Sequence, residues 1–132
     1  MDHAATTPIT DPVLAEFNRQ LKQLGNPSSL HAYGRDTRRA LEEAREKIAN
    51  FLRCQPSEII FTASGTEADN LAIKGLFWST NKQVILVSSI EHHAVLDPAK
   101  WLVEKEGAEL IEIPVDRNGV IDLDFLEDIV TK

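Results

Sequence analysis

Two short stretches of the sequence carry side chains that could bind an anion or move a proton. The first is Ser64, Gly65 and Thr66, which follow an apolar run and precede an acidic helix start. A helix N-terminus presents backbone N–H groups and a partial positive charge, glycine lets the backbone approach a ligand, and threonine adds a hydroxyl donor. At the carboxyl end of a strand, this combination predicts a phosphate-binding site.

The same residues also fit a purely structural role. Ser64 and Glu67 have the spacing of a capping box, in which the serine caps the helix and the glutamate reaches back to its start. That interpretation needs no ligand. A nucleotide site is poorly supported, because the stretch has neither the lysine of a P-loop nor the full glycine pattern of a dinucleotide-binding turn.

The second stretch contains the adjacent histidines His92 and His93, which follow a predicted strand over residues 84–89. An imidazole at this place could stack on a flat ring or transfer protons near neutral pH. Polar loop histidines without a chemical role are the alternative. A metal site is disfavoured, because adjacent histidines in a strand point to opposite sides and no cysteine or carboxylate cluster completes a set of ligands.

The hydrophobic pattern predicts the elements that would position these residues. It favours an α/β fold with a mainly parallel sheet flanked by helices, arranged as an arm over residues 1–11 and a domain portion over residues 12–132. The predicted helices cover residues 12–24, 37–52, 66–77, 94–105 and 122–130, and the predicted strands cover residues 58–62, 84–89 and 108–115.

Several local features follow from this pattern. Asp11 is expected to cap the first helix and Gly25 to end it. Residues 25–34 are expected to form a polar loop in which His31 is solvated. The helix over residues 66–77 is expected to turn an inner face toward the rest of the domain, made of Ala68, Leu71, Ala72, Gly75 and Leu76.

The predicted sheet has too few strands for a buried parallel sheet, whose strands need neighbours on both edges. We therefore expect the chain to be incomplete as a domain, or to pair with other chains.

Composition and charge exclude several classes of protein. A net charge of -7 argues against a nucleic-acid partner. No apolar stretch is long enough to cross a bilayer. The N-terminus lacks the basic region followed by an apolar run that is typical of a signal peptide. The single cysteine, Cys54, cannot form an internal disulfide and fits a reducing compartment. We expect a soluble cytoplasmic protein, or one of an organelle matrix with its leader removed.

Four segments of the sequence are distinctive when taken together and in order. They are DHAATTP (2–8), GNPSSLHAYG (25–34), IIFTASGTEADNLAIKG (59–75) and EHHAVLDP (91–98). Together they resemble the N-terminal part of a cysteine desulfurase of the NifS/IscS branch, and RNGVIDLDFLE (117–127) also fits. These enzymes are pyridoxal-phosphate (PLP) enzymes of the class V aminotransferase group, with the fold-type I architecture.

This resemblance implies a role for each residue of the two stretches. Gly65 and Thr66 match the pair that holds the phosphate of pyridoxal 5'-phosphate. His92 matches the catalytic histidine that stacks on the pyridine ring and is proposed to move protons.

The resemblance also implies residues on the substrate side. Ala4, Ala5 and Thr6 match an N-terminal arm near the substrate. Asn26 and His31 lie at the two ends of a stretch that matches a loop near the mouth of the active site.

The implied activity is conversion of L-cysteine to L-alanine, with the sulfur carried as an enzyme persulfide to a sulfur-acceptor protein for iron–sulfur cluster assembly or tRNA thiolation. Relatives are homodimers. The Schiff-base lysine and the persulfide cysteine of the family have no match here, and Cys54 stands in a different context. We therefore expect the chain alone to be inactive and to need the missing C-terminal portion, in cis or in trans.

Two alternatives stay open. The chain could come from another class V PLP enzyme, such as a selenocysteine lyase or an aminotransferase. It could also be a non-catalytic fragment that only binds a partner.

Overall fold

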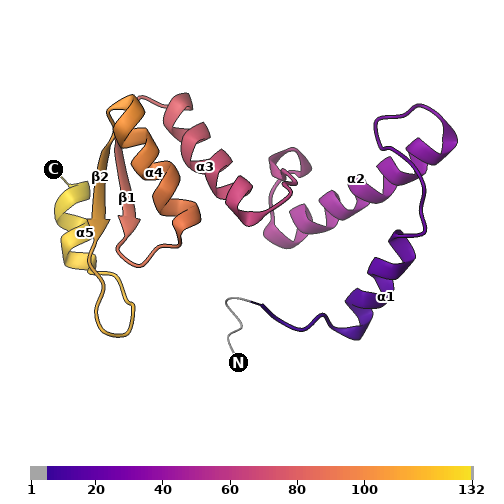
Figure 1. Ribbon diagram of the computed structural model, residues 1–132, viewed down its shortest axis with the longest axis horizontal. Helices are drawn as coiled ribbons and strands as arrows, with labels where there is room; N and C mark the ends of the chain where they lie inside the picture. The colour runs from indigo at the N-terminus through magenta and orange to yellow at the C-terminus, as the bar shows by residue number, and fades with distance from the viewer. Residues whose placement is uncertain (1–5, 132) are drawn as a thin grey trace. The chain divides into compact units, whose positions relative to one another are not determined.

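The computed structural model describes residues 6–131, and the chain divides into two compact units, Met1–Ile60 (unit 1) and Phe61–Lys132 (unit 2). Among the described residues, no helix combines the length and the apolar character needed to cross a bilayer. The predicted division into an arm and a domain at residue 12 stays a prediction. The elements are α1 (Asp11–Gln20), α2 (Ala32–Leu52), the 3-10 helix η1 (Pro56–Glu58), α3 (Gly65–Ser79), β1 (Val84–Ser88), α4 (His93–Glu106), β2 (Glu109–Ile113) and α5 (Leu123–Val130). Figure 1 labels the α-helices and the strands.

Helix α1 differs at both ends from its prediction. Thr10 is the N-cap and makes no side-chain capping bond, so Asp11 is not the cap but lies in the first turn. Its negative charge there still suits the helix dipole. The helix ends at Gln20, well before Gly25. Gly25 is needed for another reason, because a Cβ at that position would collide with the carbonyl of Tyr33 at the start of α2.

Helix α2 starts earlier than predicted and includes the end of the expected polar loop. Its C-cap, Arg53, adopts the left-handed conformation with φ 57°, and the amide of Cys54 donates to the carbonyl of Ala49 at 3.0 Å. Ala49 is fully buried, and the Arg45 guanidinium donates to the carbonyl of Ile59. These hydrogen bonds therefore hold the segment from Cys54 to Ile59 against helix α2.

The strand predicted over residues 58–62 is wrong. Pro56–Glu58 form a 3-10 turn in which the Glu58 carboxylate accepts from the amide of Gln55 at 2.6 Å, and residues 59–64 are irregular. An apolar run becomes a strand only where a neighbouring strand offers a ladder. The described residues hold one sheet, of two strands, and this run is not part of it.

Unit 2 is built on a parallel pair of strands. β1 and β2 pair in parallel, in a register that runs from Val84 opposite Glu109 to Ser88 opposite Ile113, which confirms the predicted parallel pairing. Helix α4 connects the two strands and packs against both, as Figure 1 shows. The buried apolar residues of this unit are Val87, Ala94, Ala99, Leu102, Ala108 and Ile113.

Helix α3 packs against α4, but the predicted inner face is wrong. Leu71 and Leu76 are 49% and 65% exposed. The face toward α4 instead carries Asn70 and Lys74. Apolar residues occur around most of α3, so hydrophobicity alone could not select the side that meets α4.

The C-terminal helix α5 matches its predicted range to within one residue. Gly119 has a φ of 81° in the turn at residues 117–119, and residues with a Cβ rarely adopt such an angle. Asp122 caps α5, since its Oδ1 accepts from the amide of Phe125 at 3.0 Å.

Candidate functional site

The start of α3 is capped as the sequence predicts. Ser64 Oγ accepts from the amide of Glu67 at 3.2 Å, and the Glu67 carboxylate accepts from the amide of Ala63 at 2.8 Å. Glu67 thus bonds the amide of Ala63, the residue before the cap, rather than the amide of Ser64 itself.

This cap does not occupy the first two amides of the helix. The first intrahelical bond runs from the amide of Ala68 to the carbonyl of Ser64, at 3.1 Å. The amides of Gly65 and Thr66 therefore have no intrahelical acceptor. Both residues are exposed, and a Cβ at Gly65 would meet nothing within 4 Å. The structural and the phosphate-binding interpretations are thus compatible, because they use different groups of one helix end.

His92 stands at the start of α4, beyond the carboxyl end of β1. It is the N-cap of α4, and its Nδ1 accepts from the amide of Ala94 at 3.0 Å. Serine, threonine, asparagine and aspartate are the usual residues for this role. The hydrogen bond holds the ring in place although the side chain is exposed.

A cavity of about 360 Å³ brings Thr66 and His92 together. Asn70 donates from Nδ2 to the carbonyl of Thr66 at 3.0 Å, which ties this wall to the first turn of α3. The walls come from Thr66, Asn70 and Lys74 of α3 and from His92, Asp97 and Trp101 at the start and middle of α4.

Lys74 places a positive charge at the far end of this cavity. Its Nζ lies 4.5 Å from the centroid of the Trp101 ring, a cation–π contact. Lys74 is eight residues beyond Thr66, or about 12 Å along the helix axis. The sequence analysis did not identify Asn70, Lys74 or Trp101 as lining residues. The spacing of four residues could have indicated two of them, because it places Asn70 and Lys74 on the same helix face as Thr66.

His93 lies in the same cavity but makes a different contact. Its Nδ1 is 3.5 Å from Oδ1 of Asp97, one helical turn further on. Within residues 6–131, no group of three or more His, Cys, Asp or Glu side chains could hold a metal ion.

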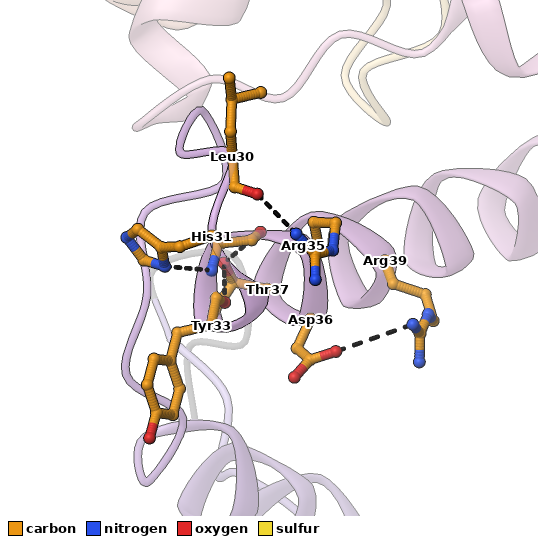
Figure 2. Close-up of polar contacts among 8 residues, drawn as sticks. Leu30, His31, Tyr33, Arg35, Asp36, Thr37 and Arg39 are labelled. Atoms are coloured by element: carbon orange, nitrogen blue, oxygen red, sulfur yellow. Dashed lines mark hydrogen bonds and ion pairs between the residues drawn. The ribbon is translucent and has the colours of Figure 1, made fainter.

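The residues predicted to lie on the substrate side belong to unit 1, as far as the structure describes them. Asn26 closes a turn, since its Oδ1 accepts from the amide of Ser28 at 2.9 Å. His31 is exposed, as expected, and it also caps α2 through Nδ1, which accepts from the amide of Gly34 at 3.2 Å (Figure 2). Thr6 is exposed. Ala4 and Ala5 lie outside the described residues.

Figure 2 also shows how the turn before α2 is held. The Arg35 guanidinium donates to the carbonyl of Leu30 at 2.6 Å, and the Thr37 hydroxyl donates to the carbonyl of Gly34 at 3.0 Å. The rings of His31 and Tyr33 meet edge to face with centroids 6.3 Å apart. The bond from Arg35 thus ties Leu30 of the loop to α2, whereas the bond from Thr37 lies within the helix.

Comparison with known proteins decides the family. Residues 1–132 match the family model described as aminotransferase class-V. The chain belongs to the class-V aminotransferase family. It is 49% identical over 135 residues to the cysteine desulfurase IscS of Dictyoglomus turgidum, and 45% identical over 133 residues to the IscS-like cysteine desulfurase of Mycobacterium tuberculosis. These matches cover 100% and 97% of this chain but 34% of each relative, so the chain spans about a third of their length.

Solved structures give the same relation. A NifS-like protein superposes with a TM-score of 0.82 at 38% identity, covering 95% of this chain and 35% of that protein. The structure described as SspA in complex with cysteine gives a TM-score of 0.83 at 35% identity, covering 96% and 37%. These matches confirm the predicted fold class and the predicted relation to NifS/IscS cysteine desulfurases.

Proposed function

We propose that this chain forms the phosphate-binding end and one wall of the ring pocket in a PLP-dependent cysteine desulfurase, which converts L-cysteine to L-alanine and carries the sulfur as an enzyme persulfide. The observation that carries this proposal is that Thr66 and His92 line one cavity. The names of the class-V relatives support it, and one solved neighbour is described in complex with cysteine.

The first turn of α3 fits the phosphate end of pyridoxal 5'-phosphate. The amides of Gly65 and Thr66 lack intrahelical acceptors, the space beside Gly65 is open, and the Thr66 hydroxyl adds a third donor. A phosphate dianion is stabilised there by hydrogen bonds and by the positive end of the helix dipole. When bound, the cofactor would supply an electron sink for the bonds at the substrate α-carbon.

His92 would serve the other end of this site. Its backbone follows the carboxyl end of β1, and the bond from the Ala94 amide fixes the ring at the start of α4. In the proposal, the imidazole stacks on the cofactor ring and transfers protons during the reaction. Asn26, His31 and the N-terminal residues Ala4, Ala5 and Thr6 would approach the substrate.

The remaining groups of the reaction would come from the C-terminal portion, in cis or in trans. That portion would bring the Schiff-base lysine and the mobile cysteine, so we propose that the chain alone is inactive. The role of the mobile cysteine is not assigned to Cys54, which is half-buried just after the end of α2. The complete enzyme would be a cytoplasmic homodimer that passes sulfur to an acceptor protein for iron–sulfur cluster assembly or tRNA thiolation.

Exposed apolar side chains support a need for further protein surface. On α1, Val13, Phe17 and Leu21 are 59%, 58% and 66% exposed. On α3, the side of Leu71 and Leu76 is also uncovered. Apolar groups of this extent are commonly covered by other parts of a fold or by another subunit.

A chimera tests the activity. These 132 residues would replace the matching third of the Dictyoglomus turgidum relative, and alanine and persulfide formation from L-cysteine would be measured. We expect both products from the chimera and neither from the 132-residue chain alone. A folded chimera that yields no alanine, while the relative is active under the same conditions, would overturn the proposal.

Thr66 offers a direct test of the phosphate site within that chimera. Thr66→Ala removes one hydrogen bond to a charged group, so we expect PLP affinity to fall about tenfold or more. Equilibrium dialysis measures this affinity. Thr80→Ala makes the same change at the opposite end of α3, where carbonyls rather than amides are exposed, and should leave the affinity unchanged. Equal effects of the two substitutions would contradict the assigned phosphate site.

A further inference from the structure

The two adjacent histidines of the candidate site are held in opposite ways. Nδ1 of His92 receives a hydrogen bond from the Ala94 amide at 3.0 Å, whereas Nδ1 of His93 lies 3.5 Å from the carboxylate oxygen of Asp97. The rings meet edge to face, with centroids 6.3 Å apart. The same ring atom therefore faces a donor in one histidine and an acceptor in the other.

These contacts select different tautomers. A neutral imidazole carries one proton, and its other nitrogen is an acceptor. The Ala94 amide needs the lone pair of Nδ1, so the proton of neutral His92 is on Nε2. The carboxylate of Asp97 attracts a proton to Nδ1 of His93, so neutral His93 favours the opposite tautomer.

We propose that His92 serves its site as a donor through Nε2, and that it takes up a second proton only by giving up the cap of α4. This inference rests on the proposed function, because it names the atom through which His92 would act there. The Nε2 of the neutral ring already holds its proton, so an incoming proton must go to Nδ1. A protonated Nδ1 is a donor facing the Ala94 amide, which is also a donor, so the capping bond breaks.

The same logic sets a condition for passing a proton through the ring. A proton taken at Nδ1 gives the imidazolium, and release of the other proton from Nε2 leaves the neutral Nδ1–H tautomer. That tautomer cannot accept from Ala94, so the first turn of α4 stays uncapped until the ring returns to its starting state. Proton movement at His92 and order at the start of α4 are therefore coupled.

The charged neighbours of His92 come from both helices. Lys74 lines the cavity from α3, with its ammonium over Trp101, and His93 and Asp97 line it from α4. Glu91 precedes His92 in the chain. Within residues 6–131, the hydrogen-bond donor to Nδ1 of His92 is the Ala94 amide and not one of these side chains.

The tautomers can be read directly, without any cofactor. Long-range 1H–15N spectra of the 15N-labelled 132-residue chain show which ring nitrogen is protonated. Above the titration range of imidazoles, we expect a single Nε2–H tautomer for His92 and mainly Nδ1–H for His93. A His92 ring with Nδ1–H, or with the averaged signals of a free imidazole, would refute the inference.

The coupling is tested in the same sample by lowering the pH. We expect the Ala94 amide resonance to shift with the same midpoint as the His92 ring. His92→Asn retains a capping oxygen but has no proton to gain in this range, so the Ala94 response should disappear. His93→Gln is the matched control and should leave that response intact. If the Ala94 amide resonance does not shift while the His92 ring gains its proton, the proposed coupling is wrong.

These outcomes are separate from those of the chimera. If His92→Asn does not fold, the unmutated chain alone still decides both the tautomer and the coupling. A chimera that makes no alanine would count against the proposed function. The protonation state of the His92 ring is decided separately, by the 1H–15N spectra.

Discussion

Asp116 shows how one side chain can organise a turn through backbone amides. Its Oδ1 accepts from the amides of Asn118 at 2.8 Å and Val120 at 3.0 Å, and its Oδ2 accepts from the Asn118 side chain at 3.2 Å. The bond from Val120, followed by that from Asn118, lowers the pKa of Asp116. Backbone amides of a turn thus stabilise a negative charge, which is the physical effect proposed for phosphate at Gly65 and Thr66.

Acid should therefore loosen this turn at an unusually low pH. Because the pKa of Asp116 is lower in the folded chain than its unfolded value of about 3.9, its stabilising contribution is present above that value and is lost as the pH falls through the lowered pKa. We expect the Val120 amide resonance to shift in that acid window. Asp116→Asn should abolish the shift. A midpoint at or above the ordinary carboxyl value would contradict the assignment.

Of the two side-chain caps predicted, one was confirmed. Ser64 caps α3, whereas Asp11 lies in the first turn of α1 and is not its cap, so a short oxygen side chain near a helix start is not sufficient. The caps made by His31 and His92 were not predicted, since an imidazole cap depends on ring orientation that a sequence pattern does not specify. The roles of Gly65, Thr66 and His92 toward a cofactor remain predictions.

At the scale of elements, the existence of helices and strands was more predictable than their partners. The limits of β1, β2, α4 and α5 lie within two residues of their predictions, because each has its own hydrophobic pattern and turn residues. The strand over residues 58–62 and the inner face of α3 failed for a common reason. Both depend on which other element lies alongside, and that is a tertiary property.

Two glycines in unit 2 should respond in opposite directions to the same substitution. Gly75 lies inside α3 with open space around it, so Gly75→Ala should raise the free energy of unfolding by about 0.5–1 kcal/mol. Gly107 is the C-cap of α4 with φ 72°, so Gly107→Ala should lower it by about 1–2 kcal/mol. Urea unfolding followed by tryptophan fluorescence measures both. Changes of the same sign would show that backbone conformation is not the deciding factor.

At the scale of the whole molecule, the buried apolar residues are unevenly divided. Among the described residues, Ala49 is the buried hydrophobic residue of unit 1, and the others all belong to unit 2. Leu102 is the large side chain that is fully buried. Sequence hydrophobicity could not predict this division, because it marks α1 and α3 as apolar without showing that the described chain leaves them uncovered.

Two leucines in helices test what covers unit 2. Leu102 is 0% exposed and Leu76 is 65% exposed, so Leu102→Ala should lower the free energy of unfolding by about 2–5 kcal/mol and Leu76→Ala by about 0.5 kcal/mol or less. Trp78 and Trp101 both lie in unit 2, so tryptophan fluorescence follows this unit. In the chimera with the relative's remaining length, the cost of Leu76→Ala should rise by more than 1 kcal/mol, because further elements would then bury that side chain. An unchanged cost in the chimera would show that the exposed side of α3 is a true surface, and that the proposed C-terminal portion packs elsewhere.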